Sequence, residues 1–99
     1  MEFFIDPEHL RHLAIKGISP ADVDGVASDP GMFLLTANDE QYFASGKTSG
    51  GRHLKLLIAK QPDGRVFVIT GWCMSRREKK TYRAHRRPRR NDEEKKETA

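Results

Sequence analysis

The sequence has one cysteine and one tryptophan in 99 residues, and it has no long hydrophobic run. A lone cysteine, Cys73, excludes an internal disulfide and a cysteine-rich zinc site. The longest apolar runs fall far short of the roughly 20 residues that a membrane-spanning helix needs. The first residues, Met-Glu-Phe-Phe, lack the basic segment with which a secretory signal peptide begins. These absences predict a reduced, cytoplasmic protein without a membrane partner.

Common cofactor and hydrolase motifs are absent as well. The sequence contains no Walker loop, no GxGxxG and no Ser-His-Asp arrangement. His9 and His12 share one face of a predicted helix, but no further ligand lies near them in the sequence. We therefore expect neither a cofactor nor a metal ion. Without a neighbouring histidine, Cys73 is interpreted as a small buried hydrophobic residue.

Charge is distributed very unevenly along a chain that is long enough for one small domain. Residues 1–75 contain seven Lys or Arg and nine Asp or Glu, a net charge of −2. Residues 76–90 contain nine basic residues and one acidic residue, a net charge of +8. Residues 91–99 return to a net charge of −2. This pattern predicts a near-neutral domain, a strongly basic segment and a polyanionic partner.

The N-terminal third shows the signals of a short strand and two helices. Residues 2–5, Glu-Phe-Phe-Ile, predict the strand, and Pro7 then opens a helix that ends before Gly17. Ser19 and an acid three residues later open a second helix that ends near residue 28. The residues predicted to face inward are Leu10, Leu13, Ala14, Val23 and Val26. Together these segments predict a helical hairpin with a tight turn.

From residue 32 the apolar period changes from 3.6 to 2, which is typical of strands. The predicted strands cover residues 32–36, 41–46, 52–60 and 65–71. Short turns join them, and tight turns cannot link parallel strands, so we expect an antiparallel meander. One face of the sheet must be covered, and the helical hairpin is the available element.

Ser75 and Glu78 form a capping-box pattern that opens a last helix, which runs to about Arg86. This helix is nearly devoid of apolar residues, and Tyr82 is its clearest inward candidate. Residues 88–99 have no residue able to anchor to a core, and we expect them to be disordered. The basic block predicts contact with nucleic-acid phosphates. The alternatives are a solubilising helix or a segment that binds an acidic protein.

A second group of basic residues lies on the predicted sheet. Lys47, Arg52, His53 and Lys55 can hold a phosphate and stabilise a pentavalent transition state without metal. Histidine also moves protons at neutral pH. Arg52 and His53 are chain neighbours, so they should point to opposite faces, and Arg52 is the preferred phosphate ligand. The alternative is an ordinary solvated sheet face.

Three segments carry a family resemblance. The first is His-Leu-Arg-His-Leu-Ala-Ile-Lys-Gly-Ile-Ser-Pro-Ala-Asp-Val over residues 9–23. The second is Tyr-Phe-Ala-Ser-Gly-Lys-Thr over residues 42–48, with Gly-Arg at 51–52. The third is Val-Ile-Thr-Gly over 68–71, followed by Met-Ser-Arg-Arg-Glu-Lys-Lys-Thr-Tyr over 74–82. In this order they resemble BrnT-like toxins, a branch of the RelE/ParE superfamily of bacterial type II toxin–antitoxin modules.

The resemblance covers residues 1–87 and implies an α+β fold. It implies a RelE/ParE-like antiparallel sheet, an N-terminal helical hairpin on one face and a basic C-terminal helix, with residues 88–99 as a charged tail. It implies a toxin that cleaves mRNA without metal, through the 2′-hydroxyl of the substrate, and so arrests translation and growth. The implied partners are mRNA, free or on the ribosome, and a cognate antitoxin, typically a small ribbon-helix-helix DNA-binding protein.

The resemblance and the residue chemistry together yield two groups of candidate residues. The catalytic candidates are Lys47, Arg52, His53, Arg76, Arg77 and Glu78. The nucleic-acid-binding candidates are Trp72, Lys79, Lys80, Tyr82, Arg83, Arg86 and Arg87. The family usually has a basic residue near the end of its last strand, where this chain has Trp72. That tryptophan either stacks on a base or belongs to the core.

Two other functions remain alternatives. One is a non-catalytic module that binds RNA or the ribosome, which Trp72 in place of the usual basic residue favours. The other is a toxin of the same fold that acts on a protein target such as gyrase.

Overall fold

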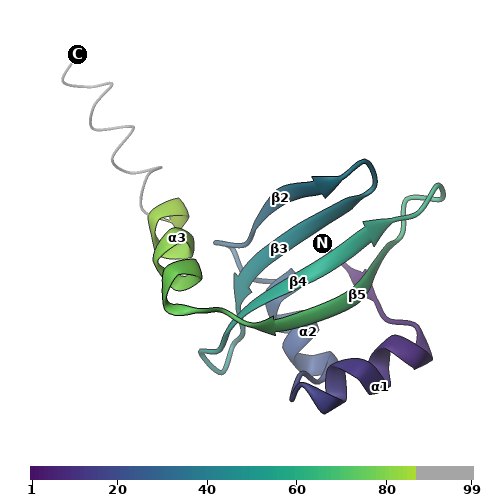
Figure 1. Ribbon diagram of the computed structural model, residues 1–99, viewed down its shortest axis with the longest axis horizontal. Helices are drawn as coiled ribbons and strands as arrows, with labels where there is room; N and C mark the ends of the chain where they lie inside the picture. Colours follow the sequence, from purple (N-terminus) through teal and green to yellow (C-terminus); the bar gives the residue numbers. More distant parts are fainter. Residues whose placement is uncertain (87–99) are drawn as a thin grey trace.

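The structure, a computed structural model, describes residues 1–86 as five strands and three helices (Figure 1). In chain order they are β1 (Phe3–Phe4), α1 (Pro7–Ile15), α2 (Pro20–Ala27), β2 (Phe33–Asn38), β3 (Gln41–Lys47), β4 (His53–Lys60), β5 (Val66–Cys73) and α3 (Arg76–Arg86). The prediction of a disordered tail over residues 88–99 lies outside the described residues, as does Arg87. The chain is an α+β protein.

The five strands form one sheet in the order β1-β5-β4-β3-β2. Strands β2 to β5 pair antiparallel in succession, as their short turns predict. Strand β1 instead pairs parallel with β5, Phe3 opposite Val66 and Phe4 opposite Phe67. The sheet is therefore mixed, and the prediction of a purely antiparallel sheet was wrong at this edge. Two helices lie between β1 and the meander, and a connection of that length allows parallel pairing.

Helices α1 and α2 lie on the same side of the sheet (Figure 1). Leu13 of α1 and Val23 and Val26 of α2 are fully buried in one hydrophobic cluster. The strand residues of that cluster include Ala44, Leu54, Leu56, Ile58 and Val68. Leu10 and Ala14 are exposed, so the prediction that they face inward was wrong. Helix α1 contacts β5 near the edge of the sheet, and that contact buries only a narrow stripe of the helix.

Local start signals in the sequence correspond to the observed helix ends. The Ser19 hydroxyl accepts from the Asp22 N–H at 3.1 Å, and the Asp22 carboxylate accepts from the Ser19 N–H at 3.0 Å. Gly17 has a φ of 77°, a conformation that only glycine adopts without cost. These contacts fix the turn between α1 and α2.

Strand β4 separates the two faces of the sheet. Leu54, Leu56 and Ile58 are buried on the side of α1 and α2. The alternate residues of this strand, among them His53 and Lys55, lie on the opposite side, which we call the open face. Helix α3 follows β5 and lies beyond the start of β2 (Figure 1). Among the described residues, no helix is long and apolar enough to span a bilayer.

Candidate functional site

Four positively chargeable side chains come together where α3 meets the open face. Lys47 and His53 lie directly opposite each other on β3 and β4. Lys79 and Arg83 are one helical turn apart on α3, and both act electrostatically on His53. We call Lys47, His53, Lys79 and Arg83 the basic cluster. The sequence named all four residues but could not show that a strand pair and the last helix bring them together.

His53 is the titratable centre of the basic cluster. Partial burial lowers its pKa below the ordinary histidine value, and the positive charges of Arg83, Lys47 and Lys79 lower it further. The nearby Asp29 carboxylate opposes this shift only in part. Its ring lies edge-on to that of Tyr82, with centroids 5.4 Å apart. The imidazole is therefore mostly neutral at neutral pH and able to accept a proton.

Asp29 ties α3 to the sheet beside this cluster. The Tyr82 hydroxyl donates to Asp29 Oδ2 at 2.5 Å, and the Lys47 backbone N–H donates to the same oxygen at 2.9 Å. Asp29 Oδ1 accepts from the Gly31 N–H at 3.0 Å. One carboxylate thus positions both Lys47 and the last helix. Sequence patterns do not indicate this role of Asp29, because it lies in a turn, 53 residues from Tyr82.

Tyr82 is only 1 % exposed and packs beside Phe33, with ring centroids 6.3 Å apart. The prediction that Tyr82 faces inward is confirmed. A buried ring offers no face to a nucleobase, so its assignment as a nucleic-acid-binding residue is corrected. Tyr82 is an anchor for α3.

Glu78 lies at the first turn of α3 and is fully engaged. Its Oε1 accepts from the Ser75 backbone N–H at 2.8 Å, which completes the predicted capping box. Its Oε2 lies 3.2 Å from Lys55 Nζ and accepts from Trp72 Nε1 at 3.4 Å. The Ser75 hydrogen bond is the main cause of a lowered Glu78 pKa, and Lys55 and Trp72 lower it further. These contacts give Glu78 a capping role, and its catalytic assignment stays a prediction.

Trp72 lies on the open face in partial contact with solvent. Its ring meets Phe43 edge-on, with centroids 6.0 Å apart, and it lies opposite Lys55 on β4. Lys55 Nζ in turn lies 4.9 Å from the centroid of the Phe43 ring. Trp72 is therefore not part of the hydrophobic cluster beneath α1 and α2, so its interpretation as a residue of that core is wrong. Its stacking on a base stays a prediction.

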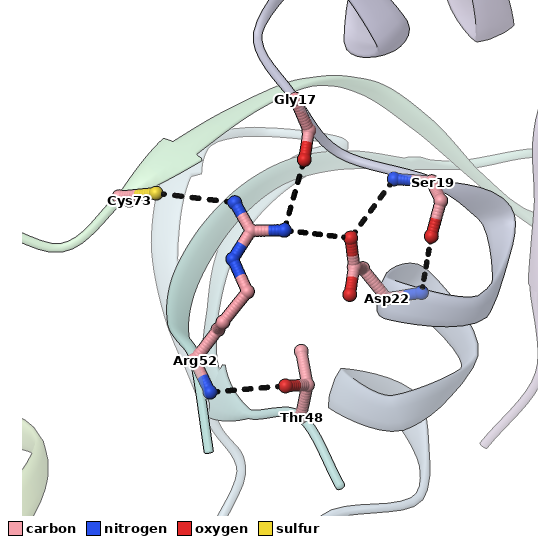
Figure 2. Close-up of polar contacts among 6 residues, drawn as sticks. All are labelled: Gly17, Ser19, Asp22, Thr48, Arg52 and Cys73. Atoms are coloured by element: carbon pink, nitrogen blue, oxygen red, sulfur yellow. Dashed lines mark hydrogen bonds and ion pairs between the residues drawn. The ribbon is translucent and has the colours of Figure 1, made fainter. Parts of the chain in front are cut away.

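Arg52 lies on the other side of the sheet end, as strand alternation predicts (Figure 2). Its Nη1 donates to Gly17 O at 2.9 Å and to Asp22 Oδ2 at 2.8 Å. Its Nη2 donates to Cys73 Sγ at 3.4 Å, and this bond is the main cause of a raised Arg52 pKa. These contacts connect the α1–α2 turn to the end of β5. Arg52 and His53 thus do not point into one site, and the assignment of Arg52 as a phosphate ligand stays a prediction.

Cys73 is exposed rather than buried, which corrects its interpretation as a core residue. Cys73 is the last residue of β5. The remaining basic candidates lie along α3. Arg76, Arg77 and Lys80 are exposed there, and Arg86 is its last residue.

Residues 1–86 contain no group of three or more His, Cys, Asp or Glu that could hold a metal ion. His9 Nδ1 lies 3.9 Å from an Asp6 oxygen, its nearest acidic partner. A cleft of about 720 Å³ lies at the far end of the sheet, lined by residues that include Phe4, Leu34 and Tyr42. No residue of the basic cluster lines it, so the cleft and the cluster are separate features.

No protein-family model matches this sequence, and no curated protein is found to be similar to it.

Proposed function

We propose that this protein is a toxin of the RelE/ParE type, similar to BrnT-like toxins, and that it cleaves mRNA without a metal ion. The observation that carries the proposal is a histidine with a lowered pKa among three cations on the open face. A neutral base can take the proton of a ribose 2′-hydroxyl, and positive charges beside it can stabilise the transition state of RNA cleavage.

The proposed reaction uses the basic cluster in two ways. The His53 imidazole takes the proton of a ribose 2′-hydroxyl, and the resulting oxygen attacks the adjacent phosphorus. Lys47, Lys79 and Arg83 stabilise the negative charge of the pentavalent transition state. The bond to the 5′-oxygen then breaks, and that oxygen takes a proton from the imidazolium or from water. The products are a 2′,3′-cyclic phosphate and a free 5′-hydroxyl.

Helix α3 supplies the attraction that brings RNA to this site. Arg76, Arg77 and Lys80 are exposed along it, next to the two α3 members of the basic cluster. Cations arranged in this way bind phosphates largely by counterion release. The helix is held in place by the Tyr82–Asp29 bond and by the Ser75–Glu78 cap. RNA binding and catalytic geometry therefore depend on the same anchors.

Trp72 favours a second candidate function, that of a non-catalytic RNA- or ribosome-binding module. It stands where the resembled family usually has a basic residue, and it offers an aromatic ring on the open face. Aromatic stacking binds bases without cleaving them. In this alternative the chain binds RNA as tightly but leaves it intact.

The decisive experiment is cleavage of a labelled single-stranded RNA by the purified protein in the presence of a chelator. We expect products that end in a 2′,3′-cyclic phosphate, and no cleavage of an oligonucleotide with 2′-deoxyribose at the scissile position. His53→Gln should abolish cleavage while RNA binding persists, and His12→Gln on α1 serves as the matched control. Tight binding of RNA without cleavage by the unaltered protein would favour the binding module.

Expression in a bacterial host separates the remaining alternatives. A ribonuclease toxin should stop growth and shorten mRNA, and a cognate antitoxin should relieve the arrest. We propose that this antitoxin is a small ribbon-helix-helix protein encoded beside this chain. Growth arrest with intact mRNA and accumulated DNA damage would instead indicate a protein target such as gyrase.

A further inference from the structure

Strand β2 is an edge strand of the sheet, and it lacks most of the features that usually protect such an edge. Only one of its sides pairs with a described strand, β3. Its sequence, Phe-Leu-Leu-Thr-Ala-Asn, has no charge and no proline. Natural sheet edges are usually protected from further pairing by lysine, proline or a bulge. The one irregularity lies between Thr36 and Asn38, which leaves Phe33–Thr36 regular.

Two adjacent leucines of β2 are exposed on opposite faces of the sheet. Leu34 lies opposite Ala44, on the side of α1 and α2, and is 39 % exposed. Leu35 lies opposite Phe43 on the open face and is 43 % exposed. A partner that covers only one face would leave one leucine in water. A further strand paired to the edge would cover both.

The two ends of β2 carry opposite charge. Asp39 and Glu40 form the turn at its C-terminal end, with Lys60 beside them, so this turn keeps a net negative charge. The basic helix α3 lies at its N-terminal end (Figure 1). There, His85 stacks on Phe33, with ring centroids 3.8 Å apart. The nearby acid at this end, Asp29, already accepts hydrogen bonds from Tyr82, Lys47 and Gly31.

We propose that β2 is a homodimer interface, in which β2 of two copies pair antiparallel and join their sheets. Antiparallel pairing places the acidic turn of each copy beside the basic α3 of the other, twice by symmetry, whereas parallel pairing would place like charges together. A second copy would therefore pair with the free edge of β2, cover Leu34 and Leu35, and place opposite charges beside each other. The interface is independent of the proposed ribonuclease activity.

The symmetry also assigns a register. A two-fold axis perpendicular to the sheet keeps the helices of both copies on one side and pairs residues of the same face. This arrangement is obtained when Leu35 lies opposite Leu35 of the second copy. Leu34 then lies opposite Thr36 of that copy. Directly opposite residues in antiparallel strands have Cβ atoms about 4.5–5.5 Å apart, close enough for a disulfide after a small adjustment.

Cysteine cross-linking tests this register on the full chain. In a Cys73→Ser background, Leu35→Cys should form a disulfide-linked dimer under mild oxidation. Thr36→Cys is the matched control and should remain monomeric on a denaturing gel, because Thr36 lies opposite Leu34 in this register. A cross-link from Thr36→Cys alone, or from neither variant, would overturn the assigned pairing.

Sedimentation of the unaltered chain tests the dimer itself. We expect a concentration-dependent mass that reaches twice that of one chain. Leu35→Lys should give a monomer, whereas Ile15→Lys on α1, where Ile15 is 86 % exposed, should leave the dimer intact. Circular dichroism of both variants controls for folding. An unaltered chain that stays monomeric at all concentrations would refute the proposed homodimer.

Asp39→Asn with Glu40→Gln should weaken dimerisation by roughly threefold to tenfold at low salt, as expected for a few exposed charge pairs. Added salt should weaken the unaltered dimer and remove this difference. Glu8→Gln on α1 is the matched control and should have no effect. Equal dimerisation by all these variants would contradict the antiparallel arrangement.

Discussion

Arg52 and His53 show how one step along a strand separates two chemistries. The Arg52 guanidinium donates to Gly17 in the α1–α2 turn, to Asp22 in the first turn of α2 and to Cys73 at the end of β5. His53 points to the open face, where Tyr82 and three cations surround it. The guanidinium is hydrogen-bonded within the fold, and the imidazole is free to act as a base in the proposed reaction.

Replacing Arg52 should therefore reduce stability more than activity. Arg52→Ala removes an ion pair of which the arginine side chain is 40 % exposed, together with its hydrogen bond to Gly17 O. We expect the free energy of unfolding to fall by about 1 kcal/mol. Denaturant titration measures this loss, and RNA cleavage per folded molecule should be unchanged. A large loss of cleavage in a well-folded Arg52→Ala protein would return Arg52 to the active site.

At the scale of elements, the packing of α2 on the sheet depends on a small residue. A Cβ atom at Gly46 of β3 would lie 2.8 Å from Val26 Cγ1 and 3.3 Å from the Val26 carbonyl oxygen. Real Cβ atoms do not approach so closely, and the neighbour includes backbone. Helix α2 can contact β3 at this distance only because residue 46 has no side chain.

Gly46→Ala should force α2 away from β3. Overpacking of this kind typically costs about 1–3 kcal/mol, which should appear as a lower denaturation midpoint. Gly50→Ala is the matched control, because a Cβ there meets only Thr48 Oγ1, at 3.8 Å. Equal stability of the two variants would contradict the close packing of α2.

The other functional element is α3, whose cations serve both RNA binding and the state of His53. Replacing Lys79 and Arg83 with Ala should reduce the slope of log affinity against log salt by about 1.4, because each lost phosphate contact removes about 0.7 for single-stranded RNA. It should also raise the pKa of His53, since both cations lower it. Salt-dependent binding and an NMR titration measure the two effects. An unchanged salt slope would exclude Lys79 and Arg83 from RNA contact.

For the whole molecule, His53 links stability and activity to pH. Its pKa is lower in the folded chain than in the unfolded one, where histidine titrates at about 6.5. The unfolded state therefore binds a proton more readily as pH falls, so stability is complete above pH 6.5 and decreases below it. Cleavage should rise with pH through the lowered His53 pKa as the base becomes neutral.

His53→Gln separates this effect from other titrations. In that variant the loss of stability just below pH 6.5 should shrink. A second loss should remain at more acidic pH, because Glu78 and Asp63 have lowered pKa values and their stabilisation disappears as they are protonated. Thermal unfolding across pH provides the measurement. Identical profiles for both proteins would show that His53 is not the linked group.

Sequence patterns alone determined much of the secondary structure. Ser19 with Asp22, and Ser75 with Glu78, marked two helix starts because capping uses residues only three apart. Alternation along residues 53–60 identified the buried face of β4 for the same local reason. The concentration of positive charge in residues 76–90 predicted a polyanionic partner, which remains a prediction.

Only the tertiary structure decided what depends on contacts between distant residues. The parallel pairing of β1 with β5 and the Asp29–Tyr82 bond join segments more than fifty residues apart, and no local pattern records such pairs. The same holds for Arg52, whose partners come from the α1–α2 turn and from β5. Residue type and spacing predicted which side chains carry charge. Whether a charge is committed to the fold or left for a ligand depended on which partners the folded chain brings beside it.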